Sequence, residues 1–171
     1  MQETPQQYTR RILGYVEGKD ALRVQRGTAG ELKKLVKGLS KKQLAWRPNR
    51  ESWSISQILA HLADAEVVLS WRMRSILGSN GTEIQAFNQD AWADTFQYAK
   101  SDPKWSIEVF SLLRENNLRM LKALSKEKWD YYGMHSERGK ESIAHIAKMM
   151  AGHDTNHLKQ VAALRKGAKS R

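Results

Sequence analysis

Cysteine is absent from the 171-residue chain, and proline occurs only three times. The lack of thiols excludes disulfides, thiolate metal sites and a cysteine nucleophile, so any bound metal must be held by histidine, aspartate or glutamate. The sequence has no run of about 18 uncharged apolar residues, and its first residues do not combine a cationic patch with an apolar stretch. We therefore expect a soluble, cytoplasmic protein with no membrane segment.

The composition is that of a folded globular protein, with 40% hydrophobic and 27% charged residues. The length fits one domain over residues 1–171, with a core from about 18 to 165 and a basic tail at 166–171. The formal net charge of +11 would suit an anionic partner. The basic residues are spread along the chain, however, and cluster only near its end, where we interpret them as a solvated tail.

Apolar residues recur at helical spacing along most of the chain, and no stretch shows the sustained alternation of a strand. The first long helix is predicted to begin at a capping box formed by Thr28 and Glu31, with further helix before it around residues 6–16 and 21–25. A second capping box starts the next helix at Ser54, and this helix should run to about Leu77.

The third long helix is predicted to begin at Asp102 and Pro103, because aspartate favours the N-cap and proline the first helical position. The fourth runs from about Glu141 to Leu164. Roughly 25 residues connect the second helix to the third, which is longer than an ordinary turn between helices. The fold class predicted is all-α, a four-helix bundle with a long crossover connection between helices 2 and 3.

Three of the five histidines lie on the inward-facing stripes of two predicted helices. His153 and His157 are one helical turn apart on the fourth helix, so their side chains can hold one ion, and His61 lies on the second. Three neutral imidazoles would form an open metal site with positions left for water or substrate. The same residues could equally be core histidines that are bonded to carbonyls or carboxylates, and spacing leaves both interpretations open.

Two segments resemble the DinB/YfiT superfamily of metal-dependent four-helix proteins. They are WSISQILAHLADAE at residues 53–66 and AGHDTNHLKQ at 151–160, and the resemblance extends from about residue 18 to 164. The family's metal ligands are one histidine on the second helix and an H-x-x-x-H pair on the fourth. The resemblance therefore implies that His61, His153 and His157 bind a divalent transition metal, which could be zinc, nickel or iron.

Four further polar residues are candidates for supporting the metal ligands or touching substrate: Asp64, Asn117, His145 and Gln160. Helix geometry places Asp64 one turn from His61 and Gln160 three residues after His157, although a plain surface or capping role is equally open for each. Asn117 interrupts an apolar stripe, and His145 could border the site without binding metal.

Three more residues are expected to lie outside the metal site: His135 in a solvated loop, where it could still touch a substrate, and Glu66 and Asp154 facing outward or toward another chain.

Characterised branches of the resembled family include transferases and isomerases that use a low-molecular-weight thiol, and other members are regarded as hydrolases. The resemblance thus implies a thiol-dependent S-transferase or a hydrolase acting on a small electrophilic molecule, in a chain that forms a homodimer. The alternative is a non-catalytic basic bundle that binds nucleic acid or another polyanion, although no recognised nucleic-acid motif is present. A third hypothesis is a bundle that has kept the three histidines but has lost catalytic activity.

Overall fold

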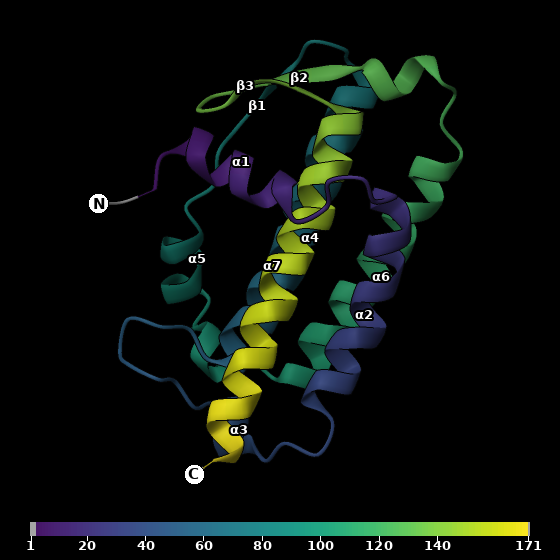
Figure 1. The fold of residues 1–171 in the computed structure, drawn as a ribbon. Coiled ribbons are helices and arrows are strands. Elements are labelled where there is room, and N and C mark those ends of the chain that lie inside the picture. The colour runs from purple at the N-terminus through teal and green to yellow at the C-terminus, as the bar shows by residue number, and fades with distance from the viewer. Residues whose placement is uncertain (1–2, 171) are drawn as a thin grey trace.

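Four long helices dominate the computed structural model, which describes residues 3–170 (Figure 1). They are α2 (Ala21–Val36), α4 (Ile55–Gly78), α6 (Pro103–Lys122) and α7 (Ile143–Lys169). Helix α2 packs on α7 and α4 packs on α6, while contacts between α2 and α6 and between α4 and α7 close the bundle. The prediction of an all-α four-helix bundle is therefore confirmed.

Shorter elements cover the sides and ends of this bundle. The short helices are α1 (Pro5–Gly14), α3 (Lys41–Leu44), α5 (Gln89–Thr95) and the 3-10 turns η1 (Tyr98–Lys100) and η2 (Glu127–Asp130). The strands are β1 (Glu83–Ile84), β2 (Tyr132–His135) and β3 (Gly139–Ser142). None of the helices in the described part of the chain is long and apolar enough to cross a membrane.

The helix starts test the capping signals directly. The side chain of Ser54 accepts from the backbone N–H of Gln57 and completes the capping box of α4, and Asp102 caps α6 as predicted. The predicted start of the first helix is wrong, because Asp20 caps α2 and Thr28 lies inside the helix. The Thr28 hydroxyl instead bonds the Val24 carbonyl, one turn back, and a buried carboxylate of α7.

Residues 166–169 of the predicted basic tail belong to a helix, and the side chains of Lys166 and Lys169 are exposed to solvent. Helix α7 continues to Lys169, and a Cβ added at Gly167 would lie 2.6 Å from the Trp46 ring. Arg165 donates to the carbonyls of Lys34 and Lys37 at the end of α2. These hydrogen bonds satisfy carbonyl groups at the C-terminal end of α2, which have no partner within that helix.

The crossover between α4 and α6 contains β1, α5 and η1, and its strand joins a small sheet at one end of the bundle (Figure 1). Strand β1 pairs in parallel with β2, which pairs antiparallel with β3. These strands are two to four residues long, too short to show the alternation by which a strand is recognised in sequence. Gly133 lets the sheet approach α4, because a Cβ there would lie 3.0 Å from Ile76 and Ile84.

The apolar core contains two main layers along the bundle, and a smaller cluster of Ala60, Ala93 and Tyr98 joins α4 to the crossover. The layer near α3 contains Leu32, Ile55, Ile58, Leu59, Leu62, Ala63, Ile107, Phe110 and Val161. The layer near the sheet contains Met73, Ile76, Ile84, Leu121, Ile143, Ile146 and Met150. Positions between these layers on the four long helices carry buried polar side chains, among them His61 and His157.

Candidate metal centre

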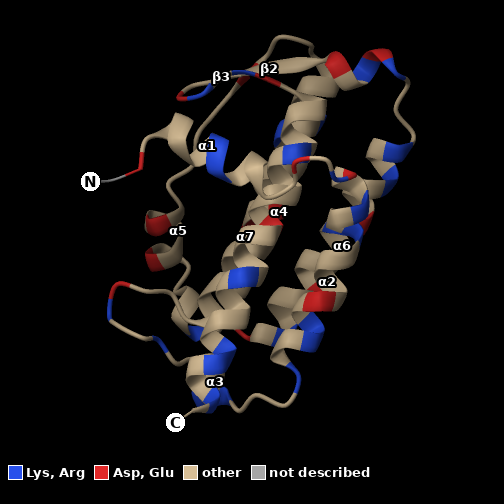
Figure 2. Ribbon diagram, in the orientation of Figure 1, with Lys and Arg blue, Asp and Glu red and all other residues tan. Residues whose placement is uncertain are grey.

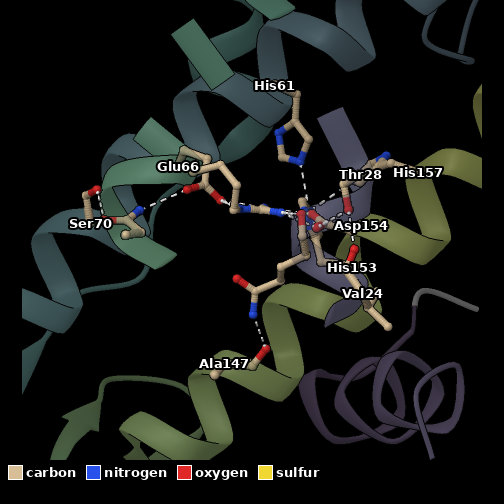
Figure 3. A network of polar contacts seen from close by, with 12 residues as sticks. Val24, Thr28, His61, Glu66, Ser70, Ala147, His153, Asp154 and His157 are labelled. Carbon is tan, nitrogen blue, oxygen red and sulfur yellow. Dashed lines mark hydrogen bonds and ion pairs between the residues drawn. The ribbon is translucent and has the colours of Figure 1, made fainter. Parts of the chain in front are cut away.

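Helices α4 and α7 bring His61, His153 and His157 together, as the spacing predicted (Figure 3). The Nε2 atom of His153 lies 3.1 Å from Nε2 of His61 and 3.0 Å from Nε2 of His157. One ring nitrogen from each of the three side chains lies within 4.8 Å of the other two. His61 and His157 are buried, with 1% and 7% of their surface exposed, whereas His153 is partly exposed.

The environment keeps these imidazoles neutral. Burial lowers the pKa of His61 to about 3, and burial lowers the pKa of His157 to about 4, although the nearby Gln160 side chain acts in the opposite direction. Burial and the two neighbouring histidines also lower the pKa of His153 well below its ordinary value. A neutral imidazole has a lone pair free for a cation, so the triad is in its ligating form at neutral pH.

The arrangement of nitrogens fits a metal ion. Four-coordinate zinc with Zn–N bonds of 2.0–2.1 Å separates its ligand nitrogens by about 3.3 Å, close to the two short distances at His153. With Nε2 as the ligand atom, each neutral ring carries its proton on Nδ1. The Nδ1 atoms of His61 and His157 are buried and have no hydrogen-bond partner among the described residues. The donor set, its spacing and its protonation therefore all suit a divalent transition metal.

Two cavities meet at the triad, and His153 lines both. The larger, of about 600 Å³, is also lined by Trp53, His157 and Gln160. The smaller, of about 320 Å³, is lined by His61 together with residues of α4, α7 and the crossover. A molecule in either cavity can thus reach the side chain that connects the other two histidines.

Helix α1 forms a wall of this site that the predicted core did not include. Its Tyr8 lines both cavities, and Arg11 donates to Asn156 of α7 at 3.0 Å. Close packing is possible because Gly152 lacks a side chain: a Cβ there would lie 2.2 Å from the Ile12 carbonyl oxygen. The residue next to His153 therefore admits a helix that partly covers the histidines.

Only one of the four predicted supporting residues touches the triad. Gln160 is close enough to His157 to act on its pKa, and it lines the larger cavity. Asp64 is turned away and accepts from the Tyr98 hydroxyl at 2.6 Å. His145 lies 3.9 Å from Glu141 and lines a separate cavity.

Trp53 connects Asp64 to the site indirectly. Its ring lies 5.0 Å from the His61 ring and 6.2 Å from the Tyr98 ring. Trp53 and Tyr98 therefore form an aromatic wall beside His61.

A buried ion network adjoins the triad, and sequence reasoning missed it (Figure 3). Arg114 of α6 donates to Glu66 of α4 at 2.6 and 2.9 Å and to Asp154 of α7, which also accepts from Thr28 of α2. Asn117 adds a hydrogen bond to Glu66 at 2.9 Å and does not touch the histidines. The network thus takes a residue from each long helix.

The expected surface positions of Glu66 and Asp154 are wrong, since both are 1% exposed. Burial opposes the charge of Arg114, but Asp154 and Glu66 outweigh it and raise the pKa of Arg114. A signal was available in the sequence, because Arg114 lies four residues after Phe110 and three before Asn117, on the same inward stripe.

His135 is also buried, in strand β2, which corrects the prediction of a solvated loop. Its Nδ1 accepts the backbone N–H of Glu137 at 3.1 Å. Burial, together with the charge of Arg138, lowers the pKa of His135 to about 4. It does not join the metal cluster.

The fold and site define a four-helix bundle in which two helices supply three convergent, neutral imidazoles. A sequence model of the DinB superfamily matches residues 26–161, and the chain belongs to that superfamily.

The chain is 26% identical over 127 residues to a protein of Oceanobacillus iheyensis named "Putative metal-dependent hydrolase", covering 74% of this chain and 72% of the relative. A Bacillus cereus protein with the same name is 24% identical over 136 residues, 80% of this chain and 78% of the relative. The structure of YfiT from Bacillus subtilis matches with a TM-score of 0.81 at 18% identity, over 86% of this chain and 85% of YfiT. YfiT is described as "a probable metal-dependent hydrolase with an unusual four-helix bundle topology". That likeness supports the fold.

Proposed function

We propose that the chain is a divalent-metal-dependent enzyme whose metal is held by His61, His153 and His157. The observation that carries the proposal is the convergence of three neutral imidazole nitrogens where two cavities meet. Zinc, nickel and ferrous iron all accept imidazole ligands, so the ligand set leaves the choice of metal to geometry and availability.

The reaction we propose is hydrolysis of a small electrophilic substrate or its transfer to a low-molecular-weight thiol. A dication bound at three imidazoles lowers the pKa of a bound water or thiol and polarises a carbonyl group. The chain's own residues shape the place where this occurs: Trp53 and Tyr98 exclude water behind His61, and Gln160 lines the larger cavity beside His157. The names of the relatives favour the hydrolase, whereas the two cavities would accommodate two reactants.

The two reactions are distinguished by supplying a panel of electrophiles with and without small thiols. A hydrolase would form the same product at the same rate without thiol. An S-transferase would require the thiol and would incorporate it into the product. Turnover that is unchanged in His153→Ala would exclude both.

Metal content is the direct test of the site. Protein purified without a histidine tag should contain about one transition-metal ion per chain, and His153→Ala should lose it. His145→Ala is the matched control, because this histidine is on the same helix but lies beside Glu141 and lines a different cavity. Wild-type protein that stays metal-free after incubation with zinc, nickel and ferrous iron would refute the proposal.

The alternative, a basic bundle that binds nucleic acid or another polyanion, has one structural observation in its favour. Helix α3 packs on the end of α7, and this end of the molecule carries the exposed side chains of Lys41, Lys42, Lys166 and Lys169 (Figure 2). Cations at a helix C-terminus also have a plain role, because they offset its partial negative charge. DNA binding that falls steeply with salt and is unaffected by His153→Ala would favour this alternative.

A homodimer and a cytoplasmic location remain predictions. Several large apolar side chains are exposed on α4 and α6 and could form a dimer interface: Val67, Trp71, Trp105 and Leu112.

A further inference from the structure

Arg72 is a buried cation with no carboxylate partner among residues 3–170. Only 6% of its surface is exposed, and its one hydrogen bond runs from Nη2 to the carbonyl of Gln85. Its Nε is buried and has no hydrogen-bond partner among the described residues. Arg114, the other buried arginine of the bundle, is by contrast held by two carboxylates.

The acidic groups near Arg72 are engaged elsewhere or solvated. Glu141 is paired with Arg138 at 2.6 Å, and Glu3 is paired with Arg11 at 2.8 Å. Glu137 is exposed and forms no ion pair with the residues that the structure describes. Burial therefore dominates, and with the nearby Arg138 it lowers the pKa of Arg72 to about 10. Burying a cation without a partner costs free energy, so this position calls for an anion from outside the chain.

One cavity is lined both by Arg72 and by two of the three histidines, His61 and His153. His61, Ala65, Leu69 and Arg72 line it from one side of α4, and His153 lines it from α7. Arg72 lies eleven residues after His61, which is about 16 Å along a helix axis, and helical side chains lean toward the N-terminus, here toward His61.

Phe87, Met149 and Met150 add apolar side chains to the lining, beside the polar and charged residues Glu3, Tyr8, Gln89, Glu137 and Arg138. The cavity therefore suits a molecule with an apolar part, a charged group that reaches Arg72 and a reacting group that reaches the histidines.

We propose that Arg72 binds a carboxylate or phosphate group of the small molecule that reacts at the histidine triad. A planar guanidinium with free N–H groups binds such oxyanions by charge-assisted, often paired, hydrogen bonds. That the bound molecule is a substrate or cosubstrate rests on the proposed function, whereas the anion site itself does not depend on a metal.

Binding of hexanoate by chelator-treated protein tests the site without any contribution from a metal. Isothermal titration should show that hexanoate binds about tenfold or more tightly than hexanol, since a hydrogen bond to a charged group is worth at least that factor. Arg72→Gln should remove this preference, and Arg72→Lys should keep part of it. The Nε–H resonance of Arg72 in ¹⁵N-edited spectra should shift on addition of hexanoate and not on addition of hexanol.

Two variants serve as controls. Arg119→Gln makes the same change at an exposed arginine of α6 and should leave hexanoate affinity unchanged. Glu137→Gln removes the unpaired carboxylate of the cavity and should leave the affinity equal or tighter.

Equal affinity for hexanoate and hexanol, or full hexanoate affinity in Arg72→Gln, would overturn the proposal. So would hexanoate binding that appears only in Glu137→Gln, because Glu137 would then be the counter-ion of Arg72. Metal content of wild-type protein is measured separately, so the metal proposal can fail while this one succeeds, and the reverse.

Discussion

Replacing Arg114 with methionine should lower the free energy of unfolding by about 3–5 kcal/mol, the usual cost of removing one partner from a buried ion pair. The guanidinium has five N–H groups, and in this structure it makes five hydrogen bonds: two to Glu66, two to Asp154 and one to the Gln25 carbonyl. Methionine fills much of the volume but donates none of these bonds. Glu66 and Asp154 would stay buried as carboxylates without a counter-ion.

Urea denaturation followed by circular dichroism, in the presence of a chelator, measures this loss separately from any metal effect. Arg119→Met is the matched control, because the exposed ion pair of Arg119 with Glu115 should contribute less than about 1 kcal/mol. Adding Glu66→Gln and Asp154→Asn to Arg114→Met should recover part of the stability, since a neutral amide costs less to bury than an unpaired carboxylate. A loss below about 1 kcal/mol in Arg114→Met would refute the reasoning.

The deficit of Arg114→Met should also depend on pH. Burial already raises the pKa of Glu66 although Arg114 opposes the shift, so removing Arg114 raises this pKa further. A group whose pKa is higher in the folded state than in the unfolded state favours folding when it is protonated, and this contribution is lost as the pH rises through the folded pKa. The deficit is therefore expected to shrink when the pH is lowered from 7 to 5, and a deficit that grows would contradict the assignment.

Three other perturbations give direct tests. Gly152→Ala should displace α1, because the added Cβ would clash with the Ile12 carbonyl, and the chain should then be cleaved faster by a protease. Gly30→Ala is the control, since nothing lies within 4 Å of a Cβ there. Equal protease resistance of the two variants would contradict this prediction. Metal at 100 times its Kd should stabilise the wild type by about 2.7 kcal/mol, seen as a higher Tm, and leave His153→Ala unchanged, and a shift shared by both would place the metal elsewhere. If the exposed face of α6 forms a homodimer, Trp105→Ser, at a side chain 63% exposed, should yield monomers in light scattering, and a wild type that is already monomeric would refute the dimer.

The bundle was predictable because its signals are local. Ser54 with Gln57, and Asp102 with Pro103, mark helix starts through contacts within one turn. The same rule wrongly predicted a helix start at Thr28, since threonine three residues before glutamate also occurs inside a helix. The decisive partner of Thr28 is Asp154, 126 residues away, and a local pattern carries no information about it.

The three histidines were predictable for a related reason. Imidazoles on the inward stripes of two helices that face each other must approach one another, and residues one turn apart on α7 are neighbours whatever the rest of the fold does. Asp64, His145 and Asn117 satisfied the same spacing rules but found other partners: Tyr98, Glu141 and Glu66. Spacing thus identifies which side chains can meet. Which polar partner each one contacts depends on how the helices are rotated and how closely they pack, and a single sequence does not give these quantities.

The ion network and the triad are connected through α7, where Asp154 follows His153 directly. Two apolar layers would tolerate a modest rotation of this helix, because apolar contacts are not directional. A guanidinium that joins Glu66 of α4 to Asp154 of α7, and a hydroxyl from α2 on the same carboxylate, fix the rotation of α7 relative to three helices at once. Residues one position apart on a helix point about 100° apart, so holding Asp154 against Arg114 directs His153 toward α4 and His61. In this arrangement the buried charges specify the geometry that three imidazoles need in order to hold one ion.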